Sequence, residues 1–461
     1  MIMLMKMKKA QSTLEILIAL AILVISIGAV ISVVFDNRFA TIFSSQQHQA
    51  LFLAEKQIET LKAQAQENFD QLVSSTSGFD FFNIETNLQE IDFQTKKAEV
   101  KVSWSLTDAR ESDVSLTTIL TNWRVLPPDD GTGPGDPPSG DWAAPVTAGT
   151  IDLGPGNEGT DVAVKDNIAY LTAKASASAK TDFFSINVSD IYNPVKLHDI
   201  NTGKGLNSVA ILGNYAYVTQ NNSSGQLQVI DISNPSSLFV VATTTLPGVN
   251  EGGLGIAVKN QLVFVGSEEA SGQEFQIFDV SNPAAPQKIS GLEINADVKD
   301  IKIFDDRAYL AVNGSSPEFL VVNISDPYNP QQLISFDCAS ICSSSTMGLS
   351  VFPANLNTLL LGTNAGLVIF DTSNISNIAK KSSLAVGGQV NDIYAISYLA
   401  FLATSNSNTE FQVINISNLS SPYLFSSFNF PQVATGIAFR DNVVYTSVRS
   451  NDALRIITST P

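Results

Sequence analysis

The chain has 461 residues, of which 44% are hydrophobic, and this length is sufficient for two or three folded domains. Its 26 Lys and Arg residues against 44 Asp and Glu residues give a net charge of -18, and an acidic surface of this kind repels nucleic acid. Two Cys and two His residues are too few for a disulfide framework, a zinc site or a Ser-His-Asp catalytic centre.

A long apolar run, Ile16 to Phe35, follows a short basic leader near the N-terminus. At about 1.5 Å per residue a helix over this run reaches about 30 Å, the thickness of the hydrocarbon core of a bilayer. The run is too long for the apolar core of a secretory signal peptide, and no small-x-small cleavage site follows it. Because the lysines precede the run, we expect a cytoplasmic N-terminus and export of everything after Phe35.

The stretch Lys8-Lys9-Ala10-Gln11-Ser12-Thr13-Leu14-Glu15, followed by this run, resembles the N-terminus of a type IV prepilin. The resemblance implies cleavage after Ala10 by a prepilin peptidase and methylation of the new N-terminus at Gln11. It also implies that Glu15 pairs with the amino group of a neighbouring subunit, so that other pilin subunits and the pilus assembly machinery are partners. Ala10 departs from the glycine usual at this position. The alternative is a plain single-pass anchor with Glu15 near the membrane interface.

Apolar residues at spacings of three and four continue this helix to about Val73, so we expect one helix over residues 11–73 with a membrane or filament core at 14–35. Residues 74–78 should break it. Period-two alternation then predicts strands around residues 100–106 and 114–120, and a third near Ile91 and Phe93. Residues 74–126 are therefore expected to form a small antiparallel sheet on the helix, an α+β arrangement that resembles a pilin head.

A Pro- and Gly-rich linker is expected at residues 127–141, and a repeat of 44 or 48 residues follows it. The repeated segments begin at Ile186, Ile230, Phe278, Val322, Phe370 and Ile414, with a degenerate seventh at Ile457. This period predicts an all-β propeller of seven blades over residues 142–461. We expect Pro145 to Ala148 to cross over and supply the outer strand that the last blade lacks. Segments such as Val229-Ile230-Asp231-Ile232-Ser233-Asn234-Pro235 resemble LVIVD-repeat propellers, which implies a fold and little about activity.

Polar residues recur at two positions of the repeat. The Asp or Asn at the end of each third strand is expected to accept a hydrogen bond from the backbone two residues on. A second set enters the innermost strands: Asp161, Ser208, Gly255, Asp300, Gly348, Asp392 and Gly436. The three carboxylates of this ring are candidate ligands of a cation such as Ca²⁺. The alternatives are unpaired polar groups in a propeller mouth, or the acid and base of a glycosidase.

Cys338 and Cys342 form a candidate disulfide that would brace an exported loop. The sequence indicates no cofactor. The function that it favours is a non-enzymatic, pilin-like surface protein, held in the cytoplasmic membrane by one span or assembled into a pilus, whose propeller serves in adhesion or ligand binding. The alternative is a single-pass surface enzyme, a hydrolase, or a sensor.

Overall fold

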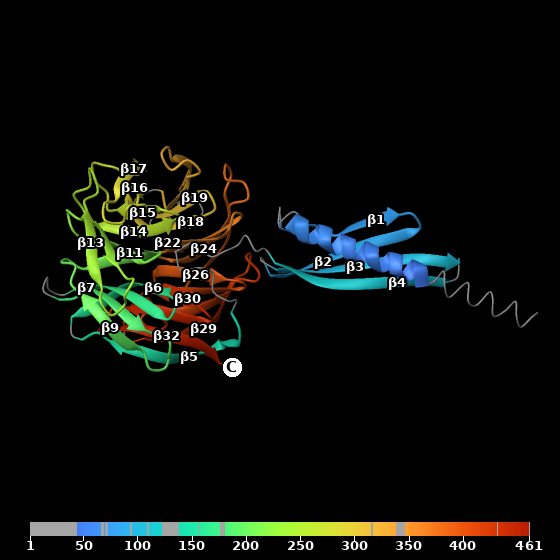
Figure 1. Cartoon of the computed structure of the whole chain (residues 1–461), viewed down its shortest axis with the longest axis horizontal. Helices are drawn as coiled ribbons and strands as arrows, with labels where there is room; N and C mark the ends of the chain where they lie inside the picture. The colour runs from blue at the N-terminus through green and yellow to red at the C-terminus, as the bar shows by residue number, and fades with distance from the viewer. Residues whose placement is uncertain are drawn as a thin grey trace, which may run out of the picture. The chain divides into compact units, whose positions relative to one another are not determined.

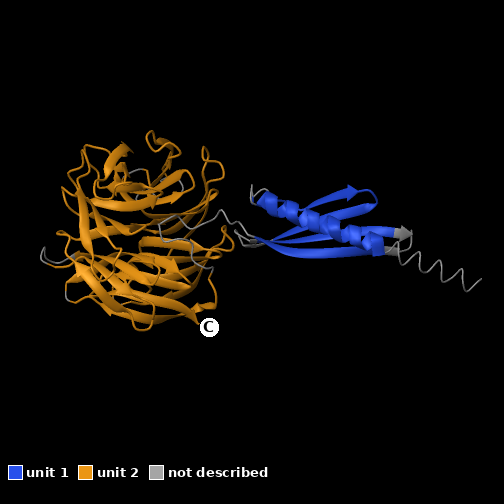
Figure 2. Ribbon diagram, viewed as in Figure 1, with its two compact units in different colours: residues 1–91, 95–122 blue, residues 92–94, 123–461 orange. Residues whose placement is uncertain are grey.

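The computed structural model divides the chain into two compact units, one of residues 1–91 and 95–122 and one of residues 92–94 and 123–461 (Figure 2). The structure describes residues 44–65, 69, 72–92, 95–107, 110–121, 138–154, 156–175, 180–314, 317–337, 346–430 and 432–460. Within these ranges, no helix is long and apolar enough to cross a membrane. The predicted span at 14–35 lies outside them.

In its described residues, the first unit is one helix packed on one face of a four-stranded antiparallel sheet (Figure 1). The helix covers residues 44–65, and the sheet has the order β1 (Ser75–Phe79), β2 (Phe82–Asp92), β3 (Thr95–Thr107), β4 (Arg110–Thr121). Small and apolar helix residues such as Ala50, Ala54 and Leu61 pack against Val100 and Trp104, all buried. The predicted inward face of the 100–106 strand is therefore confirmed as far as Trp104.

The helix is described as far as residue 65, and Leu72 lies beyond its end. There the Leu72 N-H donates to the Phe69 carbonyl at 3.3 Å, an i to i+3 bond that tightens the turn. Lys96, 7% exposed, lies nearby and donates from Nζ to the carbonyl oxygens of Phe69 and Leu72, both at 3.3 Å. A cation close to the last carbonyl groups of a helix favours its end. Leu72 and Val73 are not helical, so the expected extension to residue 73 is too long.

The sheet has one strand more than the sequence predicted. Residues 74–78 were expected only to break the helix, but Ser75–Phe79 form β1, in which Ser75 pairs with Thr86 and Phe79 with Phe82. All five residues of β1 are exposed. An exposed edge strand of Ser, Thr and Gly has no alternation of apolar and polar residues, and this is why the pattern missed it.

The second unit is built from antiparallel four-stranded sheets that follow one another in chain order. Seven of the eight sheets in the described ranges belong to it, and the eighth is the sheet β1 to β4 of the first unit. The first six sheets are β6 (Asn157–Lys165), β7 (Ile168–Ala175), β8 (Phe183–Asn187), β9 (Val195–Ile200); β10 (Leu206–Leu212), β11 (Tyr215–Gln220), β12 (Leu227–Asp231), β13 (Phe239–Thr244); β14 (Gly253–Lys259), β15 (Leu262–Ser267), β16 (Phe275–Asp279), β17 (Gln287–Leu292); β18 (Asp297–Phe304), β19 (Arg307–Asn313), β20 (Phe319–Asn323), β21 (Gln331–Phe336); β22 (Gly348–Asn355), β23 (Thr358–Thr363), β24 (Gly366–Asp371), β25 (Ala379–Leu384); and β26 (Val390–Ile396), β27 (Leu399–Thr404), β28 (Phe411–Asn415), β29 (Tyr423–Phe428).

The seventh sheet closes the ring with a strand from far earlier in the chain. It consists of β30 (Ala434–Arg440), β31 (Val443–Val448), β32 (Asp452–Thr460) and β5 (Asp141–Asp152). β5 pairs antiparallel with β32, from Asp152 opposite Asp452 to Asp141 opposite Thr460. The predicted crossover is confirmed, and β5 is longer than Pro145 to Ala148. The first strand of each sheet contacts the first strand of the next, and β30 contacts β6, so the sheets form the blades of a closed propeller.

The repeated Asp or Asn closes the same turn in six blades, as predicted. Its Oδ1 accepts the backbone N-H two residues on, for example Ser189 to Asn187 at 2.9 Å and Ser233 to Asp231 at 2.8 Å. The other four acceptors are Asp279, Asn323, Asp371 and Asn415. These turns lead from the buried third strand of each blade to its more exposed outer strand. The repeated Asp or Asn therefore stabilises the turn that ends the third strand and sets the direction of the outer strand.

Candidate functional site: the central channel and its mouth

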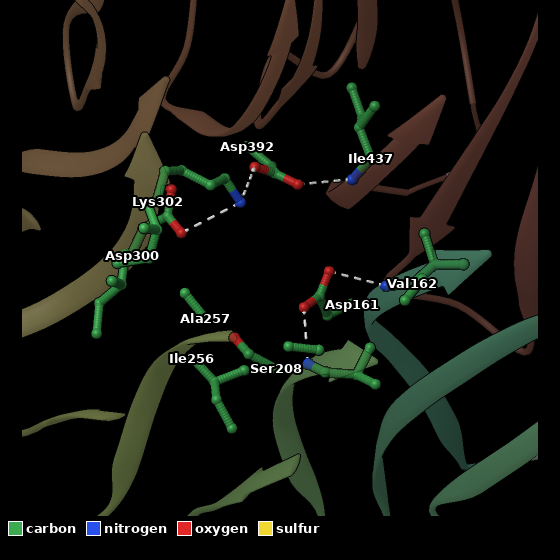
Figure 3. A pocket seen from close by; sticks show the side chains of 14 residues that line it. Asp161, Val162, Ser208, Ile256, Ala257, Asp300, Lys302, Asp392 and Ile437 are labelled. Carbon is green, nitrogen blue, oxygen red and sulfur yellow. Dashed lines mark hydrogen bonds and ion pairs between the residues drawn. The ribbon is translucent and has the colours of Figure 1, made fainter. Parts of the chain in front are cut away.

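The innermost strands of the propeller surround a central channel. Figure 3 shows Asp161, Ser208, Asp300 and Asp392 around it, as the sequence predicted. The cavity between them encloses about 50 Å³, which leaves room for only a few water-sized groups. It is lined mainly by β6, β10, β14 and β18, with contributions from β26 and β30.

Each of the three carboxylates connects its own blade to the next one. Asp161 Oδ1 accepts the N-H of Val162 at 2.8 Å, and its Oδ2 accepts that of Val209 in the following blade at 2.9 Å. Asp392 does the same with Ile393 at 2.8 Å and Ile437 at 2.7 Å. A carboxylate that accepts two backbone N-H groups satisfies donors that strand pairing leaves free.

Asp300 follows this pattern in part and also faces a cation. Its Oδ2 accepts the N-H of Val351 in the next blade at 2.9 Å, and its Oδ1 lies 3.4 Å from Lys302 Nζ. Lys302 Nζ lies 3.9 Å from Asp392 Oδ1, so it stands between two of the three carboxylates (Figure 3). Within the described part of the chain, Asp161 has no ion-pair partner. Among the described residues that line it, the channel thus holds three carboxyl groups and one ammonium group.

Burial makes ionisation of two of these carboxyl groups costly. Burial raises the pKa of Asp161 to about 7, and the nearby Asp392 carboxylate adds to the rise. Burial also raises the pKa of Asp392 to about 6, although Lys302 opposes that rise. At neutral pH the channel therefore carries less negative charge than its residue count suggests.

Two ring positions carry glycine because the neighbouring blade comes very close. A Cβ on Gly436 would lie 2.6 Å from Asp161 Oδ1, and a Cβ on Gly255 would lie 2.9 Å from the Cα of Asp300. Heavy atoms do not approach so closely without displacement, so each glycine makes room for the aspartate of the next blade.

One member of the predicted ring was misplaced. In five inner strands the pairing register shifts immediately before the ring position, for example between Gly159 and Asp161. In β22 this shift lies between Gly348 and Ser350, so Ser350 occupies the position expected of Gly348. The cause is a β-bulge, an extra residue that alternation along the strand does not reveal.

The arrangement gives no support to the predicted Ca²⁺ site. The oxygen atoms of Asp161, Asp300 and Asp392 face backbone N-H groups, and Lys302 lies between two of the side chains. Among the described residues, no three His, Cys, Asp or Glu side chains are placed to hold a metal ion together. Ala10, Gln11 and Glu15 lie outside those residues, as do Cys338 and Cys342.

A larger pocket lies where the inner strands begin, and we call it the mouth pocket. It encloses about 400 Å³ and is lined by Glu158, Gly159, Thr160, Lys174, Asn207, Asn391, Thr435 and Arg449. Sequence reasoning missed it because three of its polar residues, Thr160, Asn391 and Thr435, are the bulged residues immediately before the ring position. A bulge turns a side chain out of the regular alternation, and the pattern carried no other signal.

The floor of the mouth pocket is held by bonds that run from blade to blade. Thr160 Oγ1 donates to the Leu206 carbonyl at 2.8 Å, and Thr435 Oγ1 donates to the Gly159 carbonyl at 2.9 Å. Two amides do the same, Asn207 Nδ2 to the Gly253 carbonyl at 2.6 Å and Asn391 Nδ2 to the Ala434 carbonyl at 2.7 Å. These side chains are fixed before any ligand arrives.

The repeats match a known family model in four segments, residues 206–245, 255–290, 296–338 and 387–430, each as the LVIVD repeat. The second unit is a β-propeller of LVIVD repeats. No curated protein matches the chain.

Among solved structures, the propeller is similar to the WD40 β-propeller domain of Doa1, with 13% identity, 68% of this chain and 97% of that chain covered, and a TM-score of 0.52. It is also similar to a catalytically inactive virginiamycin B lyase from Staphylococcus aureus with quinupristin, with 12% identity, 68% and 99% coverage, and a TM-score of 0.51. Likeness at this identity supports the propeller fold alone.

Proposed function

We propose that the protein is a type IV pilin-like surface protein that displays its propeller as a binding head. One observation carries the proposal, the order of segments along the chain. A basic leader ends at Ala10, Glu15 precedes an apolar run to Phe35, and the helix of residues 44–65 then packs on an antiparallel sheet before the propeller begins. A plain membrane anchor requires neither Glu15 nor a helix that continues into a folded head.

In this proposal the chain is cut after Ala10, and the new amino group of Gln11 is methylated. Glu15 then pairs with the amino group of a neighbouring subunit, because a carboxylate in an apolar filament core requires a cationic partner. The helix holds the chain in the membrane or in a pilus or pseudopilus. The propeller stays outside the cell, where it binds a ligand or another surface.

The mouth pocket supports a binding role for the propeller. Its volume of about 400 Å³ lies within the range of about 300 to 1,000 Å³ that ligand sites in proteins occupy. The hydrolase alternative has less support. Its candidate acids, Asp161, Asp300 and Asp392, face a cavity of about 50 Å³. This is much smaller than the about 300 to 1,000 Å³ of typical ligand sites, and too small for a sugar substrate.

The test is intact mass and N-terminal sequencing of the protein from its native cell surface, with sheared filaments analysed apart from membranes. We expect a mature chain that starts at methylated Gln11 in the sheared fraction. Glu15→Ala should remove the protein from that fraction, whereas Glu55→Ala, which changes an exposed glutamate on the described helix, should not. A chain that starts at Met1 and is confined to the membrane would refute the pilin proposal.

A further inference from the structure

The mouth pocket is polar throughout, which restricts what it can bind. Of the described residues that line it, none is aliphatic or aromatic. Ligand pockets are usually lined by hydrophobic and aromatic side chains with a few polar groups among them. An apolar ligand would gain little from burial here, because the polar groups of the wall that bind water would lose it without a new partner. The ligand must therefore offer hydrogen bonds over most of its surface.

The floor of the pocket offers acceptors more than donors. The O-H groups of Thr160 and Thr435, and one amide N-H each of Asn207 and Asn391, already donate to carbonyl oxygens of the neighbouring blades. A hydroxyl or amide oxygen that has given up its donor still holds lone pairs. The exposed carboxylate of Glu158 adds two more acceptor oxygens. A ligand rich in hydroxyl groups supplies the donors that this surface lacks.

The rim of the pocket, unlike its floor, offers hydrogen-bond donors and positive charge. Lys174 and Arg449 are exposed and line the pocket, and in the described part of the chain Arg449 forms no ion pair. Glu158 lies opposite Lys174 across the β6 to β7 pair, so these two charges offset each other and Arg449 leaves an excess of one positive charge. A guanidinium group binds a carboxylate through two parallel N-H donors. The carboxylates deeper in the channel would repel an anionic group of the ligand, so that this group would stay at the rim.

Together these features define one class of ligand. We propose that the mouth pocket binds a carboxylate-bearing sugar, a uronic acid, with the carboxylate at Arg449 and Lys174 and the hydroxyl groups toward Glu158 and the floor. The proposal rests on the proposed function only for the location of the propeller outside the cell. Binding by the purified protein does not require filament assembly, so the two proposals fail separately.

The test is calorimetric titration of the detergent-solubilised full chain with D-glucuronate, with D-glucose and acetate as the neutral and the sugar-free probes. We expect glucuronate to bind at least about 10-fold more tightly than either probe, since each of them offers only part of the contacts. Arg449→Gln should weaken glucuronate binding about 10-fold or more, Lys174→Gln should weaken it less, and added NaCl should weaken it in the unmodified protein.

The matched control is Arg440→Gln. Arg440 ends β30, the strand that begins at the mouth pocket, and it forms ion pairs with Asp166 and Asp441. This variant should bind glucuronate as the unmodified protein does, and an unchanged thermal midpoint should show that each variant is folded. Equal binding of acetate and glucuronate would overturn the sugar assignment. Failure of glucuronate to bind, or equal loss in Arg440→Gln and Arg449→Gln, would overturn the site.

Discussion

Asp161 and Asp392 make the stability of the propeller depend on pH in a direction opposite to that of most paired carboxylates. Burial raises both pKa values above the ordinary aspartate value of 3.8, to about 7 and about 6. The folded state therefore keeps protons that the unfolded state has released, and its free energy of unfolding falls as the pH rises from about 4 to about 7. We expect the propeller to be about 2 to 4 kcal/mol less stable at pH 8 than at pH 5, as measured by denaturant unfolding at each pH.

Asp161→Asn should reduce this pH dependence, because an amide does not titrate. Asp190→Asn is the matched control. Asp190 is an exposed aspartate whose pKa is lowered by hydrogen bonds from the Asn193 side chain and the Tyr192 N-H, so it stays ionised from pH 5 to pH 8. A propeller that is equally stable at the two pH values, or an Asp161→Asn variant with the full dependence, would contradict this account.

For the strands and turns, the sequence predicted the features that recur from blade to blade. It did not predict the features that depart from the repeat. The repeated segments with their turn residues, such as Asp231, recur in successive blades, and their recurrence identified the blades. The bulge before Ser350 and the exposed strand β1 occur where periodicity fails. The mouth pocket depends on bulged side chains from distant repeats, and their convergence follows from ring closure and not from any local pattern.

The crossover strand β5 should be secured chiefly by one side chain, Trp142. It is 1% exposed, its ring lies 4.7 Å from that of Phe401, and its Nε1 donates to Asn442 Oδ1 at 3.0 Å. Trp142→Ala should lower the free energy of unfolding by about 3 to 5 kcal/mol, the usual cost of emptying an aromatic site in a core. Tyr192→Ala, at an aromatic residue that is 64% exposed, should change it by less than about 0.5 kcal/mol. Similar losses in both variants, followed by denaturant unfolding, would refute this role for Trp142.

At the scale of the whole molecule, the propeller should be stable without the first unit and unstable without β5. The two units are separately compact, and Ser139 is already part of the propeller, because its N-H donates to Asn442 Oδ1 and its carbonyl accepts from Ser459 Oγ. A chain that starts at residue 138 should therefore keep the thermal midpoint of the propeller. A chain that starts at residue 153 leaves β32 as an open edge, and its midpoint should fall by about 10 °C or more, with aggregation. A synthetic peptide of residues 138–152 should restore the midpoint by pairing with β32, whereas a scrambled peptide should not. If the shorter chain were as stable as the longer one, closure by β5 would not be what holds the ring together.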